Sequence, residues 1–576
     1  PPFVRRLFTP RQLGDMLCSP PTKAFTTMRD LQSPGRSPVS APNGMASTSH
    51  PLSTQAAVRI LQDGGNAMDA ALAACAVQAV VEPQSTGIGG DCFCLYSPGG
   101  GDTITAFNGS GRAPKALNSE WMLEQGMTSI ERHSPHAVTV PGAVDAWVQL
   151  NRDHGSMPLD RILAAAVGYA RDGYPITQRV SAEFAREADI LNEAGRAVFA
   201  PDGKPVPLGA RHAQPALAAT LERIGREGRA GFYEGPVGEE LLSVLKGLGG
   251  RHEESDFADA VGDYVTPIST EFRGNRVWQC PPNGQGVIAL LLLNIMSGVD
   301  TYGDTPLSAM RIHHEIEAGR LAYRDRGAVL ADPAFSDVPV EQMLDPAYAD
   351  KLRALISDSS SLDPMPPSEL PRHRSTVYIS VVDKDRNVCS LINTLFDGFG
   401  SGIMAPESGV MLHNRGQGFV VDPNHPNGIE GGKRPLHTII PAMVTRDGKA
   451  SLSYGVMGGE YQAFGHMQFL TRHFDYGMDV QMAQDTPRFF PEPFKDFVEV
   501  EGPIPEATRE ALRALGHDIR PASKPIGGSQ AISINWDNGI LTAGSDPRKD
   551  GCAMGYGSRP GNEVAGRGTG DDRNIC

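Results

Sequence analysis

The chain has 576 residues and a formal net charge of -15 at pH 7. Its pI near 5.5 argues against a nucleic-acid or anionic-membrane surface, because either would need a basic field to displace counterions. No run of about 18 apolar residues is present to cross a membrane. We therefore predict a soluble globular protein with one large or two medium domains, whose partners are small molecules.

The N-terminal region, residues 1–47, is predicted to be a largely irregular extension. It contains basic residues but lacks the continuous apolar core of a secretory signal. The eight cysteines are scattered without paired spacing, which favours reduced, mostly buried thiols. Together these features predict a cytoplasmic protein.

Two helices are predicted between Ser53 and Val81, broken at Asp63-Gly-Gly65, where glycine supplies a left-handed cap. Asn66 and Asp69 fit the start of the second helix, where an N-cap amide and a first-turn carboxylate complement free backbone N–H groups. Capping explains both residues without chemistry. Helical patterns then dominate from about residue 118 to residue 255.

A glycine-rich segment, Thr86-Gly-Ile-Gly-Gly-Asp91, superficially resembles a phosphate-binding loop. It precedes a strand pattern over residues 92–96 instead of opening a helix, so a phosphate site is not expected there.

A further helix is predicted over residues 312–323, with His313 and Glu317 one turn apart. Such a pair could bind a metal, but without a third ligand it is more typical of a solvated helix face. We predict neither a metal nor a cofactor.

The segment 357–375 has no apolar periodicity and predicts a mobile, protease-accessible linker. β-branched runs at 376–382 and 388–394 follow it, separated by a polar five-residue turn, and predict a β-hairpin. A turn centred on Asp385 pairs Val382 with Val388 and carries the register back to Thr376 opposite Thr394. This pattern alone fits either an ordinary strand residue or, after cleavage, an N-terminal threonine that carries its own general base.

After the hairpin, strands are predicted at 438–444, 450–454 and 455–459, and a helix at 462–474. Residues 561–576 are polar and glycine-rich, which predicts a tail. Helices in both parts and strands in the second indicate helices layered around β-sheets.

Several ordered motifs between Thr48 and Tyr556 resemble the γ-glutamyltranspeptidase family of N-terminal-nucleophile hydrolases. They are Asp63-Gly-Gly-Asn-Ala-Met-Asp-Ala-Ala71, Thr86-Gly-Ile-Gly-Gly-Asp91, Val140-Pro-Gly-Ala143, Glu317-Ala-Gly-Arg-Leu-Ala-Tyr323, Ser380-Val-Val-Asp-Lys-Asp385, Phe399-Gly-Ser-Gly402 and Ser545-Asp-Pro-Arg548. The resemblance implies an α+β fold, a four-layer αββα sandwich, in which a precursor cuts itself to give a large subunit (48–375) and a small catalytic subunit (376–576).

Matching the family's motifs places the cleavage between Ser375 and Thr376 and makes Thr376 the nucleophile. The resemblance further implies that Thr394 orients this nucleophile, and that Gly458-Gly459 supplies backbone N–H groups to the developing oxyanion. Without the family match, the two glycines would indicate only a turn.

The residues that bind a γ-glutamyl group in this family are not matched. Where the family has an arginine, this chain has Ser110, with Arg112 displaced by two residues, and Phe396 replaces an asparagine. Arg415 and Gly418 stand where a glutamine and an aspartate bind the α-amino group, and a Ser-Ser pair becomes His437-Thr438. Acceptors for an ammonium group are lost, and a cation and an aromatic ring have replaced them.

These changes favour a small acid without an α-amino group, and the motifs look most like the family's oxamate amidohydrolase branch, which acts in purine catabolism. The candidate substrate-binding residues are Arg415, Phe396, His437, Thr438, Asn414, Ser110 and Arg112. An authentic γ-glutamyltransferase or glutathione hydrolase, a cephalosporin-acylase-like amidase, and a scaffold that has lost turnover are the alternatives. Whether the chain forms homo-oligomers is left open.

Overall fold

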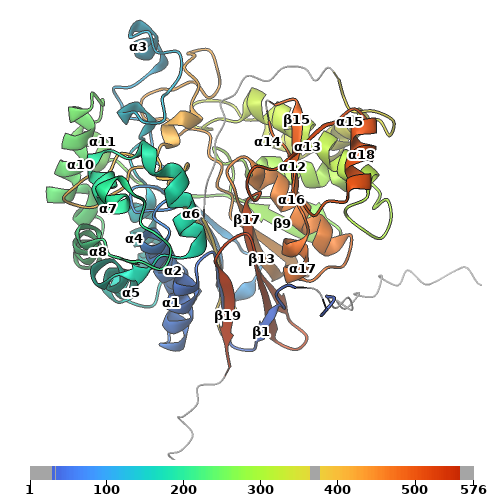
Figure 1. The fold of residues 1–576 in the computed structure, drawn as a ribbon, viewed down its shortest axis with the longest axis horizontal. Helices are drawn as coiled ribbons and strands as arrows, with labels where there is room; N and C mark the ends of the chain where they lie inside the picture. The colour runs from blue at the N-terminus through green and yellow to red at the C-terminus, as the bar shows by residue number, and fades with distance from the viewer. Residues whose placement is uncertain (1–28, 33, 364–376, 494, 558–576) are drawn as a thin grey trace, which may run out of the picture.

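The computed structural model describes residues 29–32, 34–363, 377–493 and 495–557. Two seven-stranded sheets face each other in the middle of the molecule, with helices outside both (Figure 1). This arrangement confirms the four-layer αββα sandwich. Ser375, Thr376 and the predicted C-terminal tail lie outside the described residues.

We call the first sheet the hairpin sheet, because it contains both arms of the predicted hairpin. Its strand order is β19-β2-β10-β11-β3-β4-β7. The bounds are β2 Gly44–Thr48, β3 Asp91–Ser97, β4 Thr105–Gly109, β7 Asp263–Val265, β10 Val377–Val382, β11 Val388–Thr394 and β19 Cys552–Tyr556.

The second sheet, the facing sheet, has the order β1-β18-β17-β13-β12-β9-β8, and all its neighbouring strands are antiparallel. The bounds are β1 Val39–Ala41, β8 Ile268–Phe272, β9 Asn275–Gln279, β12 Ala442–Arg446, β13 Lys449–Met457, β17 Gly528–Asn535 and β18 Ile540–Ser545. Two small sheets add β5 Tyr174–Pro175 with β6 Arg211–His212, and β14 Phe489–Pro491, β15 Phe497–Val500 and β16 Asp518–Pro521.

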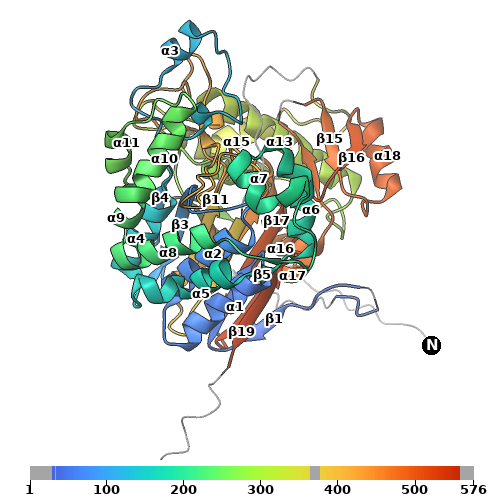
Figure 2. The same ribbon diagram turned by 60° about the vertical axis from the view of Figure 1, so that its left-hand side comes forward.

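One helical layer covers the hairpin sheet, and its helices come forward in Figure 2. It contains α1 Pro51–Gln62, α2 Ala67–Val81, α4 Ala143–His154, α5 Leu159–Asp172, α6 Gln178–Glu187, α7 Glu193–Phe199, α8 Pro215–Glu227, α9 Ala230–Tyr233, α10 Gly235–Gly247 and α11 Glu254–Ala258. α3 Ser119–Glu124 projects from the top of the molecule (Figure 1), where Met122 packs with Phe419 and Ile429. The other layer contains α12 Gly286–Met296, α13 Ala309–Val329, α14 Val340–Leu344, α15 Pro346–Arg353, α16 Tyr461–Phe474, α17 Val480–Asp485 and α18 Glu506–Ala514. Among the described residues, no helix is both long and apolar enough to cross a bilayer.

The core between the two sheets is apolar. Phe93, Tyr378 and Ile392 of the hairpin sheet pack against Met443 and Ile532 of the facing sheet, and all five are fully buried. Alternation along each strand sends neighbouring residues to the opposite, helix-covered face. The sheets are therefore held together by side-chain packing, with one face of each sheet left for its helices.

The predicted break in the first helical segment is confirmed. α1 ends before Gly64, which has φ 100°, and α2 begins after Asn66. The Asn66 side chain accepts from the backbone N–H groups of Met68 and Asp69, while the Asp69 carboxylate accepts from the Asn66 N–H. The capping interpretation of both residues is therefore correct.

Three sequence predictions need correction. The irregular extension does not reach residue 47, because β1 and β2 already belong to the sheets and Met45 is buried between partner strands. The strand expected from residue 438 begins only at Ala442. The predicted linker is not free from its start, because residues 357–362 bond to α13: His313 Nε2 donates to the Ser357 carbonyl, and the Leu362 N–H donates to Glu317.

The helix face that carries His313 and Glu317 is not solvated, which corrects the sequence interpretation. Both residues are fully buried, and His517 approaches as a third ligand-type side chain. His313 Nδ1 and His517 Nε2 are 2.7 Å apart, a hydrogen-bond distance shorter than the roughly 3.3 Å that separates two nitrogens on one tetrahedral zinc ion. Arg320 also pairs with Glu317 at 3.0 Å. The contacts favour a structural polar cluster.

Candidate active site

The hairpin has the predicted register over all of its described residues. Val382 pairs with Val388, and the pairing continues to Val377 opposite Asn393. Thr394 is the last residue of β11, is fully buried, and lies opposite Asp91 of β3. Its hydroxyl accepts from the Phe396 N–H at 2.8 Å. The predicted pair of Thr394 with Thr376 lies outside the described residues and stays a prediction.

Gly458 and Gly459 form the turn between β13 and α16. Their φ values are 128° and 60°, a region that strongly favours glycine. Both carbonyls accept hydrogen bonds, from Tyr461 N–H and Gln462 N–H respectively. Neither glycine N–H has an acceptor among the described residues. Two adjacent free donors are what an oxyanion site requires.

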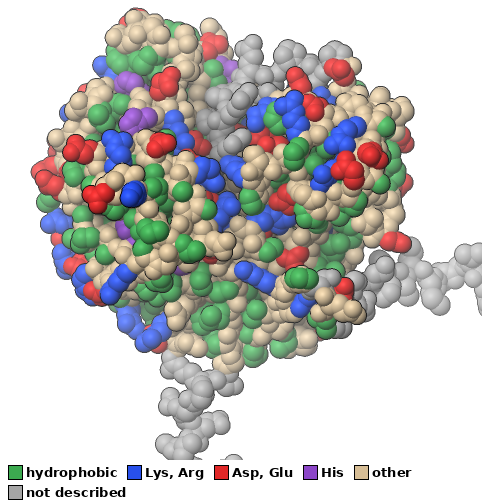
Figure 3. Space-filling view, viewed as in Figure 1, with side chains coloured by type: hydrophobic (Ala, Val, Ile, Leu, Met, Phe, Trp, Pro, Cys, Tyr) green, Lys and Arg blue, Asp and Glu red, His purple; other side chains and the backbone are tan. Residues whose placement is uncertain are grey.

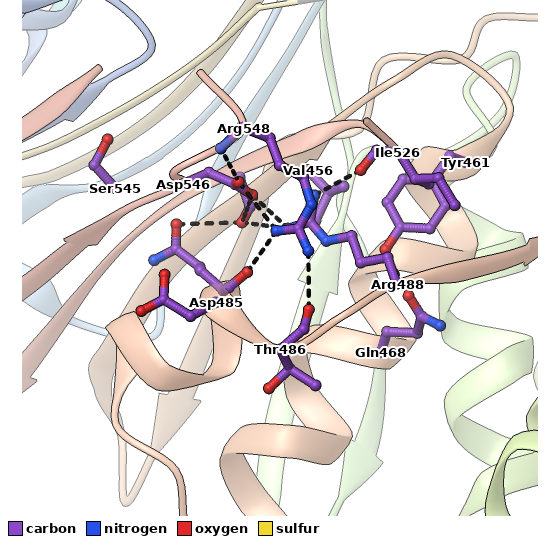
Figure 4. Close-up of polar contacts among 12 residues, drawn as sticks. Val456, Tyr461, Gln468, Asp485, Thr486, Arg488, Ile526, Ser545, Asp546 and Arg548 are labelled. Carbon is purple, nitrogen blue, oxygen red and sulfur yellow. Dashed lines mark hydrogen bonds and ion pairs between the residues drawn. The ribbon is translucent and has the colours of Figure 1, made fainter. Parts of the chain in front are cut away.

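Close packing against Gly527 fixes one side of this turn. A Cβ on Gly458 would lie 2.9 Å from Gly527 Cα, and a Cβ on Gly527 would lie 2.4 Å from the Met457 carbonyl oxygen. Positions 458 and 527 therefore both need glycine. Arg488 holds the neighbouring residue, because its Nη1 donates to the Ile526 carbonyl at 2.9 Å, and its Nη2 pairs with Asp546 at 2.5 Å (Figure 4). Asp546 of the Ser545-Asp-Pro-Arg548 motif thus holds Arg488, which in turn fixes the segment that packs against the glycine turn.

The Thr86–Asp91 glycine motif packs backbones together and, as predicted, does not open a helix. A Cβ on Gly90 would lie 2.0 Å from the Thr394 carbonyl oxygen. The Gly90 carbonyl accepts from Gly142 N–H at 3.0 Å and from Ala143 N–H at 2.9 Å. The motif thereby brings α4 and the end of β11 together at the position where Asp91 begins β3.

Asp91 is the centre of a buried polar cluster. Its Oδ1 accepts from the Gly111 N–H and its Oδ2 from His437 Nε2, both at 2.9 Å, while His413 Nδ1 lies 3.5 Å from Oδ2. Burial alone would raise the pKa of Asp91, but the interactions with His413 and His437 outweigh it and hold this pKa well below its usual range. Asp91 is therefore a buried carboxylate.

Next to Asp91, His437 is neutral at pH 7. Burial and the charge of Arg415 lower the pKa of His437 to about 3. Its Nδ1 accepts from the Ile439 N–H at 3.3 Å, so Nε2 carries the proton and donates to Asp91. The side chain orients Asp91 without adding a positive charge.

Arg415 is fully buried and only partly satisfied. Its Nη1 donates to Thr438 Oγ1 at 3.3 Å, and its Cζ lies 3.6 Å from the centre of the Phe396 ring. Nε is 4.0 Å from Asp91 Oδ2, too far for a hydrogen bond. Among the described residues, Nε and Nη2 have no hydrogen-bond acceptor. Burial lowers the pKa of Arg415 to about 9, so a charged guanidinium presents one N–H edge without an acceptor.

A hydrogen-bond network joins Arg415 to the glycine turn. Gln285 Nε2 donates to the carbonyls of Thr438 at 3.0 Å and Gly459 at 3.2 Å. Gln285 Oε1 accepts from Arg326 Nη1 at 2.7 Å, and the same Nη1 pairs with Glu460 Oε2. The candidate substrate-binding and oxyanion residues therefore belong to one buried network.

Three other predicted substrate residues lie differently. Ser110 exchanges hydrogen bonds with Asn108 and Asn283, while Asn414 donates to Asp397 and Gln417 and so braces the loop that carries Phe396. Arg112 points to the half-exposed side, where it donates to the Gly432 carbonyl and pairs with Asp263. Among the described residues, none of these three side chains bonds to Nε or Nη2 of Arg415, and their predicted roles stay predictions.

Sequence reasoning did not assign a site role to Asp91, His413, Gln285 or Glu460. Two signals were present: Asp91 ends a glycine motif at the start of a strand, and Glu460 directly follows the glycine pair. His413 and Gln285 enter the network from distant segments, and only the fold shows that they belong to it.

The charge on the face shown in Figure 3 is uneven. Lys and Arg side chains gather in its middle, between the two helical layers labelled in Figure 1. An acidic chain thus presents a locally basic surface, which attracts small anions.

The comparisons with known proteins agree with this geometry. The sequence model of the family described as gamma-glutamyltranspeptidase matches residues 53–556. The glutathione hydrolase-like YwrD proenzyme of Bacillus subtilis is 37% identical over 89% of this chain and 98% of its own length. The oxamate amidohydrolase proenzyme of Klebsiella pneumoniae is 33% identical over the same shares.

Similarity to solved structures covers the whole fold. The crystal structure of cephalosporin acylase from Bacillus halodurans matches with a TM-score of 0.86 and 36% identity, covering 92% of this chain and 100% of that one. Proenzyme relatives indicate a precursor that is cleaved into a large and a small subunit. The chain therefore belongs to the γ-glutamyltranspeptidase family and is an autoprocessing hydrolase of the N-terminal-nucleophile type.

Proposed function

We propose that this enzyme hydrolyses a small carboxylate-bearing amide such as oxamate, to oxalate and ammonia, through an acyl-enzyme on Thr376. The observation that carries the proposal is the buried guanidinium of Arg415, whose Nε and Nη2 have no acceptor among the described residues. These two nitrogens form the side-on edge that binds a carboxylate through two parallel hydrogen bonds.

The proposed reaction begins with self-cleavage. The Thr376 hydroxyl attacks the Ser375 carbonyl, the acyl group moves from N to O, and water releases the upstream chain. The freed α-amine then deprotonates the same hydroxyl. Thr394, which the predicted register would place opposite Thr376, orients this hydroxyl.

During turnover the Thr376 oxygen attacks the amide carbonyl of the substrate, and the N–H groups of Gly458 and Gly459 stabilise the oxyanion. Ammonia leaves, and water hydrolyses the ester. Arg415 holds the substrate carboxylate while the Phe396 ring packs against the guanidinium and narrows the site. Thr438 and His437 keep Arg415 and Asp91 in place.

Relatives named glutathione hydrolase support a γ-glutamyl substrate as the second candidate. A γ-glutamyl group needs acceptors for its α-ammonium, and the positions that supply them in the family are Arg415 and Gly418 here. A buried cation at this place opposes ammonium binding, which favours the acid without an amino group.

The test compares ammonia release from oxamate with cleavage of γ-glutamyl-p-nitroanilide by the same processed enzyme. We expect turnover of oxamate and little cleavage of the γ-glutamyl compound. Strong γ-glutamyl activity with inert oxamate would overturn the proposed substrate and leave the nucleophile assignment intact.

A further inference from the structure

Glu460 is a buried carboxyl that the proposed mechanism does not use. It directly follows Gly459, and 7% of its surface is exposed. Its Oε2 pairs with Arg326 Nη1, but among the described residues its Oε1 has no hydrogen-bond partner. A buried oxygen without a donor loses its hydration without compensation. Arg326 Nε also lacks an acceptor among the described residues, so the ion pair between Arg326 and Glu460 does not satisfy Oε1 and leaves it open to a ligand.

The position of Glu460 relates it to the substrate residues. Through Arg326 and Gln285 it is joined to the carbonyls of Gly459 and Thr438, and the Thr438 hydroxyl accepts from Arg415. Burial raises the pKa of Glu460, and the charges of Arg326 and Arg415 oppose this rise. Arg415 is thus close enough to act on Glu460 electrostatically.

We infer that Glu460 is a second substrate-contacting residue, whose Oε1 accepts a hydrogen bond from the N–H of the scissile amide while Arg415 binds the carboxylate. The inference rests on the proposed function and deepens it. With a carboxylate site at Arg415 and an N–H acceptor beside the oxyanion turn, the substrate class is an amide of a small acid that keeps at least one N–H on the scissile nitrogen. An ester of the same acid has no N–H to donate to Glu460.

The Glu460→Gln variant tests this with little change in shape. Arg326 requires an acceptor, so the glutamine oxygen faces Arg326 and its NH2 group takes the place of Oε1. A donor then stands where the wild type has an acceptor. We expect kcat/KM for oxamate to fall about 10- to 100-fold, and kcat/KM for the monoethyl ester of oxalic acid to change by less than about threefold. Both substrates form the same acyl-enzyme, so kcat/KM isolates the step that differs.

Glu492→Gln is the matched control, because Glu492 lies near Glu460 but pairs with Lys495. It should leave the amide-to-ester ratio unchanged, and two bands on a denaturing gel would show that each variant is processed. Equal losses on amide and ester in Glu460→Gln, or no loss on the amide, would overturn the inference. If the wild type cleaves only γ-glutamyl compounds, the proposed substrate fails. The amide-to-ester ratio of Glu460→Gln is then measured on a γ-glutamyl amide and its ester. Equal losses on both would overturn the role of Glu460, whichever acid the enzyme prefers.

Discussion

Two parts of the site are built differently. The proposed catalytic frame is defined here as Thr394, Gly458-Gly459 and the expected nucleophile Thr376. Thr394 ends a strand and the two glycines form a turn, so sheet register and backbone N–H groups set their geometry. The proposed substrate pocket, defined as Asp91, Phe396, Arg415, His437 and Glu460, consists mainly of side chains carried on the connections between elements. Changing one pocket side chain leaves the sheet register intact. A pocket substitution can therefore change the substrate while the frame is kept.

The strongest test of this comparison removes the nucleophile. Thr376→Ala should abolish both processing and turnover on every substrate, because one hydroxyl is proposed to serve both reactions. A denaturing gel should show a single full-length band, and ammonia release from oxamate should fall to background. Two bands near the sizes of residues 1–375 and 376–576 would contradict the assignment of Thr376.

A change in the glycine turn should affect the frame without affecting specificity. Gly458→Ala would place a Cβ 2.9 Å from Gly527 Cα at φ 128°, so the turn must shift and its N–H groups lose their alignment. Loss of one oxyanion donor lowers kcat about 100- to 1000-fold. We expect a loss of this size on all substrates, measured as kcat after processing is checked on a gel.

Gly477→Ala is the control for backbone strain alone, because Gly477 also has positive φ, at 64°, and open space around its Cβ position. It should lower stability slightly and leave kcat unchanged. A Gly458→Ala enzyme that lost one substrate and kept another would show that the frame and the pocket are not separable.

Arg415→Ala should affect the pocket alone. Removing a charge-assisted pair that is worth about 1.5–3 kcal/mol should lower kcat/KM for a carboxylate substrate roughly 10- to 100-fold, chiefly through KM. A neutral amide of similar size should lose far less. Arg415→Lys should not restore the activity, because an ammonium cannot present two parallel N–H bonds. An unchanged KM for oxamate would remove Arg415 from the site.

The features that could be predicted from the sequence are mainly the local ones, as in the comparison of frame and pocket. The hairpin register was predictable because side chains alternate and the turn length fixes the pairing, and it is confirmed from Val382–Val388 to Val377–Asn393. The capping of α2 was predictable because Asn66 and Asp69 act within one turn. Family motifs supplied the αββα fold, which local patterns indicated only as helices layered around sheets.

The remaining parts depend on contacts between distant segments. Asp91 meets His413 and His437 only after three segments fold together, and His517 reaches His313 across 204 positions. No local period encodes such contacts. The strand expected at residue 438 failed for a related reason, because His437 and Thr438 bond to Asp91 and Arg415 and the sheet pairing starts only at Ala442.

The smallest predicted effect is a change in the pH dependence of stability, and it concerns Glu82 beside the loop that leads to Phe396. Glu82 is the C-cap residue that follows α2, and its carboxylate accepts from Ser49 and Gln78. The carbonyl of nearby Ser85 accepts from the Leu395 N–H in the loop before Phe396. Burial raises the pKa of Glu82 from 4.5 to about 7. Between these values the folded protein keeps a proton that the unfolded chain has released.

The contribution of Glu82 to stability is therefore fully present below about pH 4.5 and is lost as the pH rises through about 7. The free energy of unfolding should fall by up to about 1.4 kcal/mol per pH unit in this window from Glu82 alone. Glu82→Gln should lack this decline, as measured by denaturant unfolding between pH 5 and 8, and should be the more stable protein at pH 8.

Glu183 should change the free energy of unfolding with pH in the opposite direction, and it serves as the matched control. Burial alone would raise its pKa, but Lys549 and Arg179 outweigh it and lower the pKa of Glu183 to about 2. Its contribution is present above about pH 4.5 and is lost as the pH falls, so Glu183→Gln should be destabilised at pH 7. If Glu82→Gln kept the wild-type slope, Glu82 would be ionised in the fold. If the Glu82→Gln variant also had a changed Michaelis constant for oxamate, the residues that hold the loop before Phe396 would count as part of the pocket. The pocket would then extend further from the substrate than the contacts of Arg415 indicate.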